Sequence, residues 1–193
     1  MNNKSLALTM AALGIVVNLV LGTTVAMLKI PLLFLDTVGT IFVAAVLGPV
    51  YGAMAGGLTN LIQGMITNPG DIPFALVNIV IGIVVGLIAR KYGFNYLVAF
   101  LTGLILAVIA PLIGTPIVVW LFGGVTGGGI DFVFAWLLHS TQNIFQAAFL
   151  SRITGNLVDK VASCLLVAFL IKYLADDIIR RFGDLKQNKI DGN

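Results

Sequence analysis

The sequence predicts an all-α membrane protein with six transmembrane helices and both termini in the cytoplasm. Of its 193 residues, 59% are hydrophobic and only 10% are charged, and the mean hydropathy is +1.07. Ordinary soluble domains carry roughly 25% charged residues. Apolar runs long enough to cross a bilayer of roughly 30 Å separate the few charges between Lys29 and Arg152, which are Asp36, Asp71, Arg90, Lys91 and Asp131. We therefore expect one integral membrane domain over 1–193.

The first three helices are expected at about 5–27, 36–47 and 49–67. Ser5 can cap the first helix, which we interpret as a retained helix rather than a cleaved signal peptide because its apolar run is full length. The second helix is short because Gly48 and Pro49 end it, and Pro49 is well suited to begin the third helix almost without a loop.

The remaining helices are expected at about 72–89, 96–122 and 154–174, followed by a cytoplasmic tail at 175–193. The turn signature Asn-Pro-Gly-Asp at 68–71 precedes the fourth helix, and Pro111 and Pro116 predict a kink in the fifth. An outer loop region is expected at 123–153. Its amphipathic part, 132–150, fits either a helix on the membrane surface or a re-entrant segment.

Three segments carry small residues and one amide at intervals of four, which places them on one face of a helix. Small residues let helix backbones approach in a membrane, and a buried amide needs a partner. The pattern is compatible with simple packing, but it also predicts three helices that meet around shared polar groups. The three sets are Gly48, Gly52, Gly56, Asn60 and Gly64; Asn78, Gly82, Gly86 and Arg90; and, more loosely, Gly14, Asn18, Gly22 and Ala26.

The distribution of Lys and Arg predicts the orientation, because cytoplasmic loops are enriched in these residues. If six helices cross the membrane, Lys4, Arg90, Lys91 and the basic tail all lie on one side. That side is expected to be cytoplasmic. The loop at Lys29, the turn at 68–71 and the region 123–152 then face outward, so we expect a binding site on the outer face.

Ionisable residues inside a membrane protein are costly and tend to be paired or functional. Asp36 is expected at the outer end of the second helix, and Asn156, Asp159 and Lys160 share one face of the sixth. Two interpretations stay open for Asp159 and Lys160: they contribute to a binding site, or they only reach the interface or pair with Asp36.

Several classes of function lack their sequence signals. The chain has no nucleotide-binding loop, no metal-ligand spacing and no nucleophile-elbow pattern, so we expect no catalytic residue, no metal site and no cofactor. The net charge of +3 reflects membrane topology and does not indicate nucleic-acid binding. The single cysteine, Cys164, lies in an apolar run and is expected to be a small core residue.

The chain resembles the substrate-binding S components of energy-coupling-factor (ECF) vitamin importers. The resemblance rests on the predicted six helices and on several motifs along nearly the whole chain. These motifs are Ala7-x-x-x-Ala11, the segment from Asp36 to Thr40, the Leu47-Gly48-Pro49 break, the seam from Gly52 to Asn60, and the segment from Asn156 to Lys160.

The resemblance implies a subunit of a bacterial plasma membrane that captures a vitamin outside and topples to release it inside. Its implied partners are a scaffold transmembrane subunit, which would dock on Ala7 and Ala11, and two ATP-binding subunits that hydrolyse ATP. Among family members the arrangement looks most like those associated with cobalamin. Riboflavin, pantothenate, pyridoxine and a queuosine precursor remain alternatives, as does a membrane sensor or scaffold module.

We expect the vitamin to be bound at the outer half of the bundle, with Asn60 and Asn78 forming hydrogen bonds to its amides or to the loop that covers it. The expected site residues are Asp36, Asn60, Asn78, Gly127, Gly128, Gly129, Asp131, Asn156, Asp159 and Lys160.

Overall fold

The computed structural model describes residues 3–173, and all of the regular secondary structure in this range is helical. The expected tail at 175–193 and the last residue of the expected sixth helix lie outside the described residues. The elements are α1 (Asn3–Leu28), α2 (Val38–Leu47), α3 (Pro49–Ile66), the 3-10 helix η1 (Pro69–Phe74), α4 (Ala75–Tyr92), α5 (Tyr96–Phe122), α6 (Asp131–Thr141) and α7 (Ile144–Tyr173).

Four helical segments of the described chain are long and apolar enough to cross a membrane: Lys4–Leu28, Pro69–Tyr92, Tyr96–Phe122 and Ile144–Tyr173. The all-α prediction is therefore confirmed for residues 3–173. The second expected helix is apolar, but α2 has only 10 residues. At 1.5 Å per residue it rises roughly 15 Å, about half the thickness of a bilayer core.

The expected outer loop at 123–153 is largely helical. α6 occupies Asp131–Thr141, and α7 begins at Ile144 rather than near 154. Two polar residues of the amphipathic part end one helix and begin the next: Gln142 adopts a left-handed conformation with φ 53°, and the side chain of Asn143 accepts a hydrogen bond from the Gln146 N–H at 3.0 Å. α5 continues through Pro111 and Pro116.

The glycine seams of α3 and α4 face each other. A Cβ atom at Gly82 would overlap the backbone of Gly52, and a Cβ atom at Gly56 would overlap the backbone of Asn78. The two helices therefore touch through their main chains. Along the glycine seams, van der Waals contact between backbones takes the place of side-chain packing. Asn60 follows in the same seam of α3, one turn beyond Gly56.

Asn18 holds α1, α2 and α3 together. Its amide nitrogen donates to the hydroxyl groups of Thr40 at 2.8 Å and Thr59 at 3.0 Å, and its oxygen accepts from the Gly39 N–H at 2.7 Å. Beside it, α1 and α2 come so close that a Cβ atom at Gly39 would overlap the backbone of Gly14. The prediction that helices meet around a shared polar group is confirmed for these three helices.

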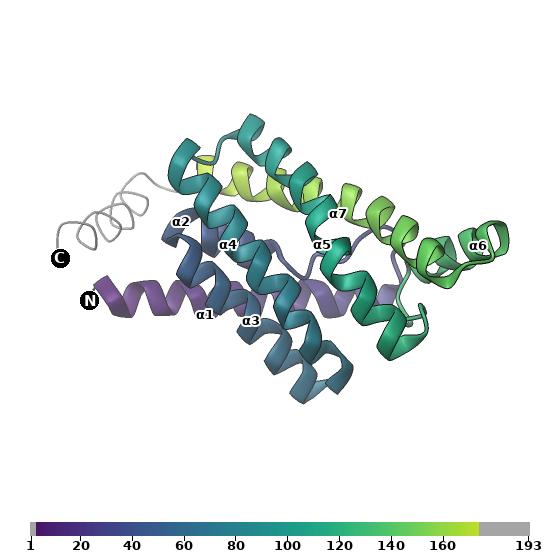
Figure 1. The fold of residues 1–193 in the computed structure, drawn as a ribbon. Helices are drawn as coiled ribbons and strands as arrows, with labels where there is room; N and C mark the ends of the chain where they lie inside the picture. Colours follow the sequence, from purple (N-terminus) through teal and green to yellow (C-terminus); the bar gives the residue numbers. More distant parts are fainter. Residues whose placement is uncertain (1–2, 174–193) are drawn as a thin grey trace.

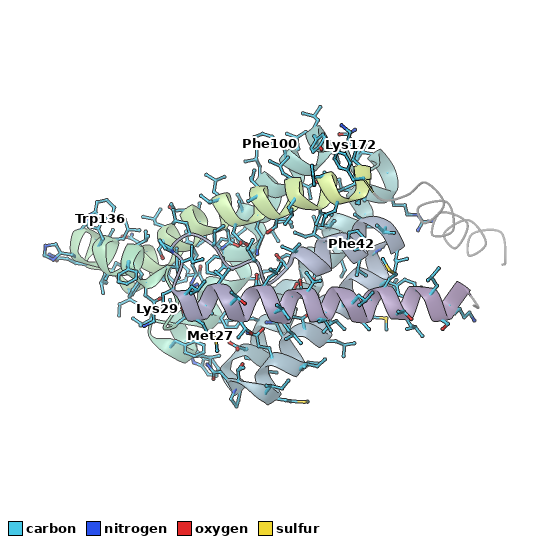
Figure 2. All side chains as sticks on the ribbon, turned by 180° about the vertical axis from the view of Figure 1, so that it is seen from behind. Met27, Lys29, Phe42, Phe100, Trp136 and Lys172 are labelled. Atoms are coloured by element: carbon cyan, nitrogen blue, oxygen red, sulfur yellow. The ribbon has the colours of Figure 1, made fainter. Side chains whose placement is uncertain are left out.

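The connections after α1, α3 and α5 lie toward one end of the bundle, and those after α2 and α4 lie toward the other. Figure 1 shows α6 at the end opposite the N-terminus of α1, with α7 running back along α5. In Figure 2, Trp136 and Lys29 lie at the α6 end, whereas Phe100 and Lys172 lie at the other. The C-terminal halves of α1, α3 and α5 and the N-terminal halves of α4 and α7 therefore share the α6 end.

We predict that Gly82→Ala lowers the thermal stability of the purified protein, because the added methyl group must push α4 away from Gly52. Overpacking of this kind costs about 1–3 kcal/mol. Gly114→Ala is the matched control, since a Cβ atom at this buried helical glycine meets its neighbours only at ordinary contact distances, 3.7 Å and beyond. It should be neutral or stabilising because alanine favours the helix. Equal melting temperatures for the two variants would contradict the backbone-contact interpretation.

Candidate functional site

Asp159 links α7 to the segment between α1 and α2. Its side chain is fully buried, and one carboxylate oxygen accepts hydrogen bonds from the Phe34 and Leu35 N–H groups, both at 2.8 Å. The other oxygen accepts from Lys160 Nζ at 2.6 Å. Because non-helical backbone inside a membrane protein must find partners within the protein, this carboxylate satisfies a loop that would otherwise be unpaired.

Lys160 is buried and neutralised from two sides. Its ammonium group donates to Asp159 at 2.6 Å, to the Thr37 hydroxyl at 2.9 Å and to Asp36 at 3.3 Å. The pairing with Asp36 was one of the two interpretations of this residue, and the structure shows it. The ion pairs hold the start of α2 against the middle of α7.

Two amides join α3 to α4 near the same end. Asn78 donates to the side-chain oxygen of Asn60 at 2.9 Å, and Asn60 donates a longer hydrogen bond of 3.4 Å to the backbone carbonyl of Asp71. The side-chain oxygen of Asn78 is buried and has no partner among the described residues. This oxygen lies close to Gly56 of α3, inside the contact between the two helices.

The glycine-rich segment before α6 is an ordered turn. The carboxylate of Asp131 accepts hydrogen bonds from the Thr126 N–H at 3.0 Å and from the Gly127 N–H at 2.6 Å. Gly129 lies against the carbonyl groups of Lys29 and Ile30, where a Cβ atom would have no room. The turn is thereby attached to the segment that follows α1.

A partly open cavity of about 300 Å³ lies between these groups, lined by α1, α3, α4, α5, α7, η1 and the two connecting segments. Its wall combines charged and amide side chains with small and aromatic residues. The polar lining residues are Asp36, Thr37, Asn60, Gln63, Asp71, Asn78, Thr126, Arg152, Asn156 and Lys160, and the others include Gly22, Leu33, Phe34, Phe74, Ile81, Pro111, Gly114 and Gly127 to Gly129. A small organic molecule with several polar groups fits this composition.

Most residues expected at the site line this cavity, namely Asp36, Asn60, Asn78, Gly127, Gly128, Gly129, Asn156 and Lys160. Asp131 and Asp159 do not line it. Asp159 supports the wall from behind through Phe34 and Leu35, and Asp131 supports the turn at Gly127. We interpret both as positioning residues.

Arg152 and Gln63 line the cavity although neither was expected there, and Asp71 joins them although it was not included in the expected site. Arg152, Asn156 and Lys160 follow one another at intervals of four and so share a face of α7. That pattern is visible in the sequence, but the sixth helix was expected to begin near 154, and Arg152 lies before that start. Gln63 lies three residues after Asn60, on the same side of α3, and helical spacing of three would have found it.

A second, more open cleft of about 660 Å³ adjoins the glycine turn on the α6 side. Gly127 and Gly128 line both this cleft and the first cavity. Around them the cleft is lined by Lys29, Val125, Asp131, Phe132, Phe134, Ala135, Leu138 and His139. The turn is therefore the partition between the two spaces.

The family model described as ECF transporter, substrate-specific component, matches residues 6–171. The chain belongs to this family. The match covers every helix that forms the cavity, and it agrees with the resemblance found in the sequence. Searches of curated proteins and of solved structures returned no match.

Membership in the family makes this chain the substrate-binding subunit of a transporter rather than an enzyme. A substrate-specific ECF component works together with an ECF energising module. The site therefore has to hold and release a substrate without changing it. Within residues 3–173, no group of three or more His, Cys, Asp or Glu side chains is placed to hold a metal ion.

The two alanines expected to dock the scaffold subunit face the interior of this ECF component. Ala7 is 2% exposed and Ala11 is 8% exposed, and Ala11 packs in a cluster with Val43 of α2 and Ala55 of α3. In this conformation, large apolar side chains such as Leu8 and Leu13 form the exposed face of α1 instead. A direct contact between these alanines and a scaffold helix would require α1 to shift.

We predict that Lys160→Met strongly destabilises the protein, because it leaves Asp159 as an uncompensated buried charge. Breaking a buried pair in this way costs about 3–5 kcal/mol. The double variant Asp159→Asn with Lys160→Met should unfold at a higher temperature than Lys160→Met alone, a coupling that a double-mutant cycle measures. Lys29→Met removes an exposed lysine and serves as the control. Additive effects of the two substitutions would contradict the coupling.

We predict that Ala11→Phe lowers the melting temperature of the isolated subunit, because the side chain of Ala11 packs against α2 and α3. Ala12→Phe, on the exposed side of the same turn, should leave the melting temperature unchanged. If Ala11→Phe instead abolished uptake with no loss of stability, Ala11 would have a docking role in place of its packing role inside the bundle.

Proposed function

We propose that this chain captures a small vitamin in the cavity of about 300 Å³ and delivers it to the interior of a bacterial cell. The observation that carries the proposal is the cavity itself, bordered by two connecting segments and lined by amides and charges, in a member of a transporter family whose task is substrate binding. The substrate enters as cargo, and no cofactor is required.

The volume of the cavity favours a vitamin of ordinary size over cobalamin. Pockets for drug-sized ligands measure roughly 300–1,000 Å³, and this cavity of about 300 Å³ is at the lower limit. Cobalamin carries a corrin ring and a nucleotide loop, so it would require the partition at Gly127 and Gly128 to open and join the cavity to the outer cleft. Pantothenate, pyridoxine, riboflavin and a queuosine precursor are the better candidates.

The proposed recognition groups are the amides and charges that face the cavity. Asn78 is one of them, and its side-chain oxygen is a buried acceptor without a partner among the described residues, which costs about 1–3 kcal/mol until it is satisfied. Asn60, Asn156 and Asp36 offer further hydrogen-bonding groups, while Phe34 and Phe74 supply aromatic contact area.

We propose that the chain crosses the membrane six times. α2 rises only roughly 15 Å, so the second crossing includes the non-helical residues 29–37, whose N–H groups at Phe34 and Leu35 are satisfied by Asp159. α3, with 18 residues, rises roughly 27 Å and supplies the third.

The proposed orientation places the cavity end outside and both termini in the cytoplasm. Lys4, Arg90, Lys91 and Lys172 belong to helix ends at the far side from α6, and an excess of basic residues is typical of the cytoplasmic side. Trp120 and Trp136, both largely exposed near α6, fit an outer aromatic belt. This orientation lets the site meet vitamins in the external medium.

The proposed partners are one scaffold transmembrane subunit and two ATP-binding subunits, which together form the energising module. Docking of the S component on this module would topple it in the membrane and expose the cavity to the cytoplasm. Co-purification of the chain with these three subunits tests this composition.

We predict that one small vitamin binds the purified protein with a stoichiometry of one. Mass spectrometry of co-purifying molecules, followed by calorimetric titration of riboflavin, pantothenate, pyridoxine, a queuosine precursor and cobalamin, makes the measurement. Gly114→Leu should abolish binding of that vitamin while the protein stays folded, because Gly114 lines the cavity and space is open beside it.

Leu112→Phe is the matched control, since Leu112 lies on the exposed side of the same helix and outside the cavity. It should bind like the unaltered protein. Tight binding of cobalamin would overturn the preference for a small vitamin, and unchanged binding by Gly114→Leu would overturn the assignment of the vitamin site to this cavity.

A further inference from the structure

Arg152 is a buried cation that forms no salt bridge with any residue of the described part of the chain. It is 8% exposed, it lines the cavity from the third turn of α7, and its Nε has no hydrogen-bond partner within residues 3–173. By contrast, the second buried cation at the cavity, Lys160, is neutralised by Asp159 and Asp36.

The acidic residue that acts on Arg152 from a distance is Asp131. Its carboxylate already accepts hydrogen bonds from the Thr126 and Gly127 N–H groups and from the Thr126 hydroxyl. It therefore supports the glycine turn and does not pair with the guanidinium. Asp36 is likewise engaged, by Lys160.

A guanidinium group stays charged in proteins, so Arg152 cannot avoid the cost of burial by losing a proton. That cost is offset only when a group of opposite charge lies against the cation. The planar fork of N–H donors matches the two oxygens of a carboxylate or phosphate group. Because Arg152 lines the cavity, such an oxyanion can reach it from the space in which the ligand is expected.

From this geometry we propose that the cavity selects ligands that carry a carboxylate or phosphate group, and that Arg152 binds this oxyanion. The inference rests on the proposed vitamin-binding function and narrows its substrate class. The amides of Asn60 and Asn78, contributed by α3 and α4, then contact the uncharged part of the ligand.

The test compares acidic ligands with their neutral analogues. Pantothenate with pantothenol, nicotinate with nicotinamide, and pyridoxal 5′-phosphate with pyridoxal are titrated against the purified protein by calorimetry. We expect the acidic member of the pair that fits to bind more tightly, by roughly 30-fold or more, because a buried charge-assisted pair is lost with the neutral one. The first two pairs report a carboxylate, and the third reports a phosphate.

Arg152→Gln should remove this preference, because it weakens the binding of the acidic ligand and leaves the binding of the neutral analogue unchanged. Arg90→Gln, which removes an exposed arginine of α4, is the control and should keep the preference. Binding of neutral members alone, or an unchanged preference in Arg152→Gln, would overturn the inference and leave the vitamin site intact. Failure of every member of the panel and of the larger vitamin panel to bind would instead overturn the proposed function, and this inference with it.

A second measurement needs no ligand. Because no described residue forms an ion pair with Arg152, Arg152→Met should leave the melting temperature of the ligand-free protein unchanged or raise it, whereas Lys160→Met should lower it. A loss of stability in Arg152→Met as large as that in Lys160→Met would show that Arg152 stabilises the fold. It would contradict the inference that the guanidinium is unpaired until an anion binds.

Discussion

The buried carboxylate of Asp159 is the group on which the polar half of the bundle depends. It lies in an apolar helix, where a charge survives only with full compensation. Compensation comes from one ammonium group, Lys160, and from two backbone N–H groups of the segment after α1. These contacts attach the connecting segment to α7, and Lys160 extends the attachment to Asp36 and Thr37 just before α2. The wall of the cavity therefore follows from the need to satisfy one buried charge.

The glycine seams provide a different kind of constraint. Where α3 meets α4 and α1 meets α2, main chains touch and leave no side chain that can move aside. Backbone contact of this type fixes the helices relative to each other and holds Asn60 and Asn78 at bonding distance. The cavity thus has a rigid side, formed by α3 and α4, and a side formed by short segments attached through hydrogen bonds, including the turn held by Asp131.

Residue spacing was enough to predict the seams and the polar contacts between helices, and most of the site residues expected from the sequence line the cavity. Asn60 and Asn78 stood out because amides are rare among glycines in apolar helices, and the structure joins them directly. Arg152 was missed because the sixth helix was expected to begin near 154, whereas α7 begins at Ile144, with Asn143 as its cap. The role of Asp159 was beyond sequence reasoning, since its partners are main-chain N–H groups, which every residue but proline carries.

Ala7 and Ala11 illustrate another limit of motif reading. A small residue at every fourth position indicates close helix contact, but it does not say whether the contacting helix belongs to the same chain or to another. In this structure Ala11 contacts α2 and α3 of its own bundle. The pattern alone predicts that two helices come close together, but it does not predict which helix is the partner.

The attachment of the segment after α1 to α7 also bears on how the protein is made. Asp159 lies 125 residues after Phe34, so the ribosome has added most of the chain before the carboxylate exists. Until then the N–H groups of Phe34 and Leu35 have no acceptor in α7, and backbone groups left unpaired in hydrocarbon are costly. During synthesis, water, lipid headgroups or the insertion machinery must therefore satisfy these N–H groups. They gain their acceptor in the protein only when α7 has been made and packs against the segment after α1.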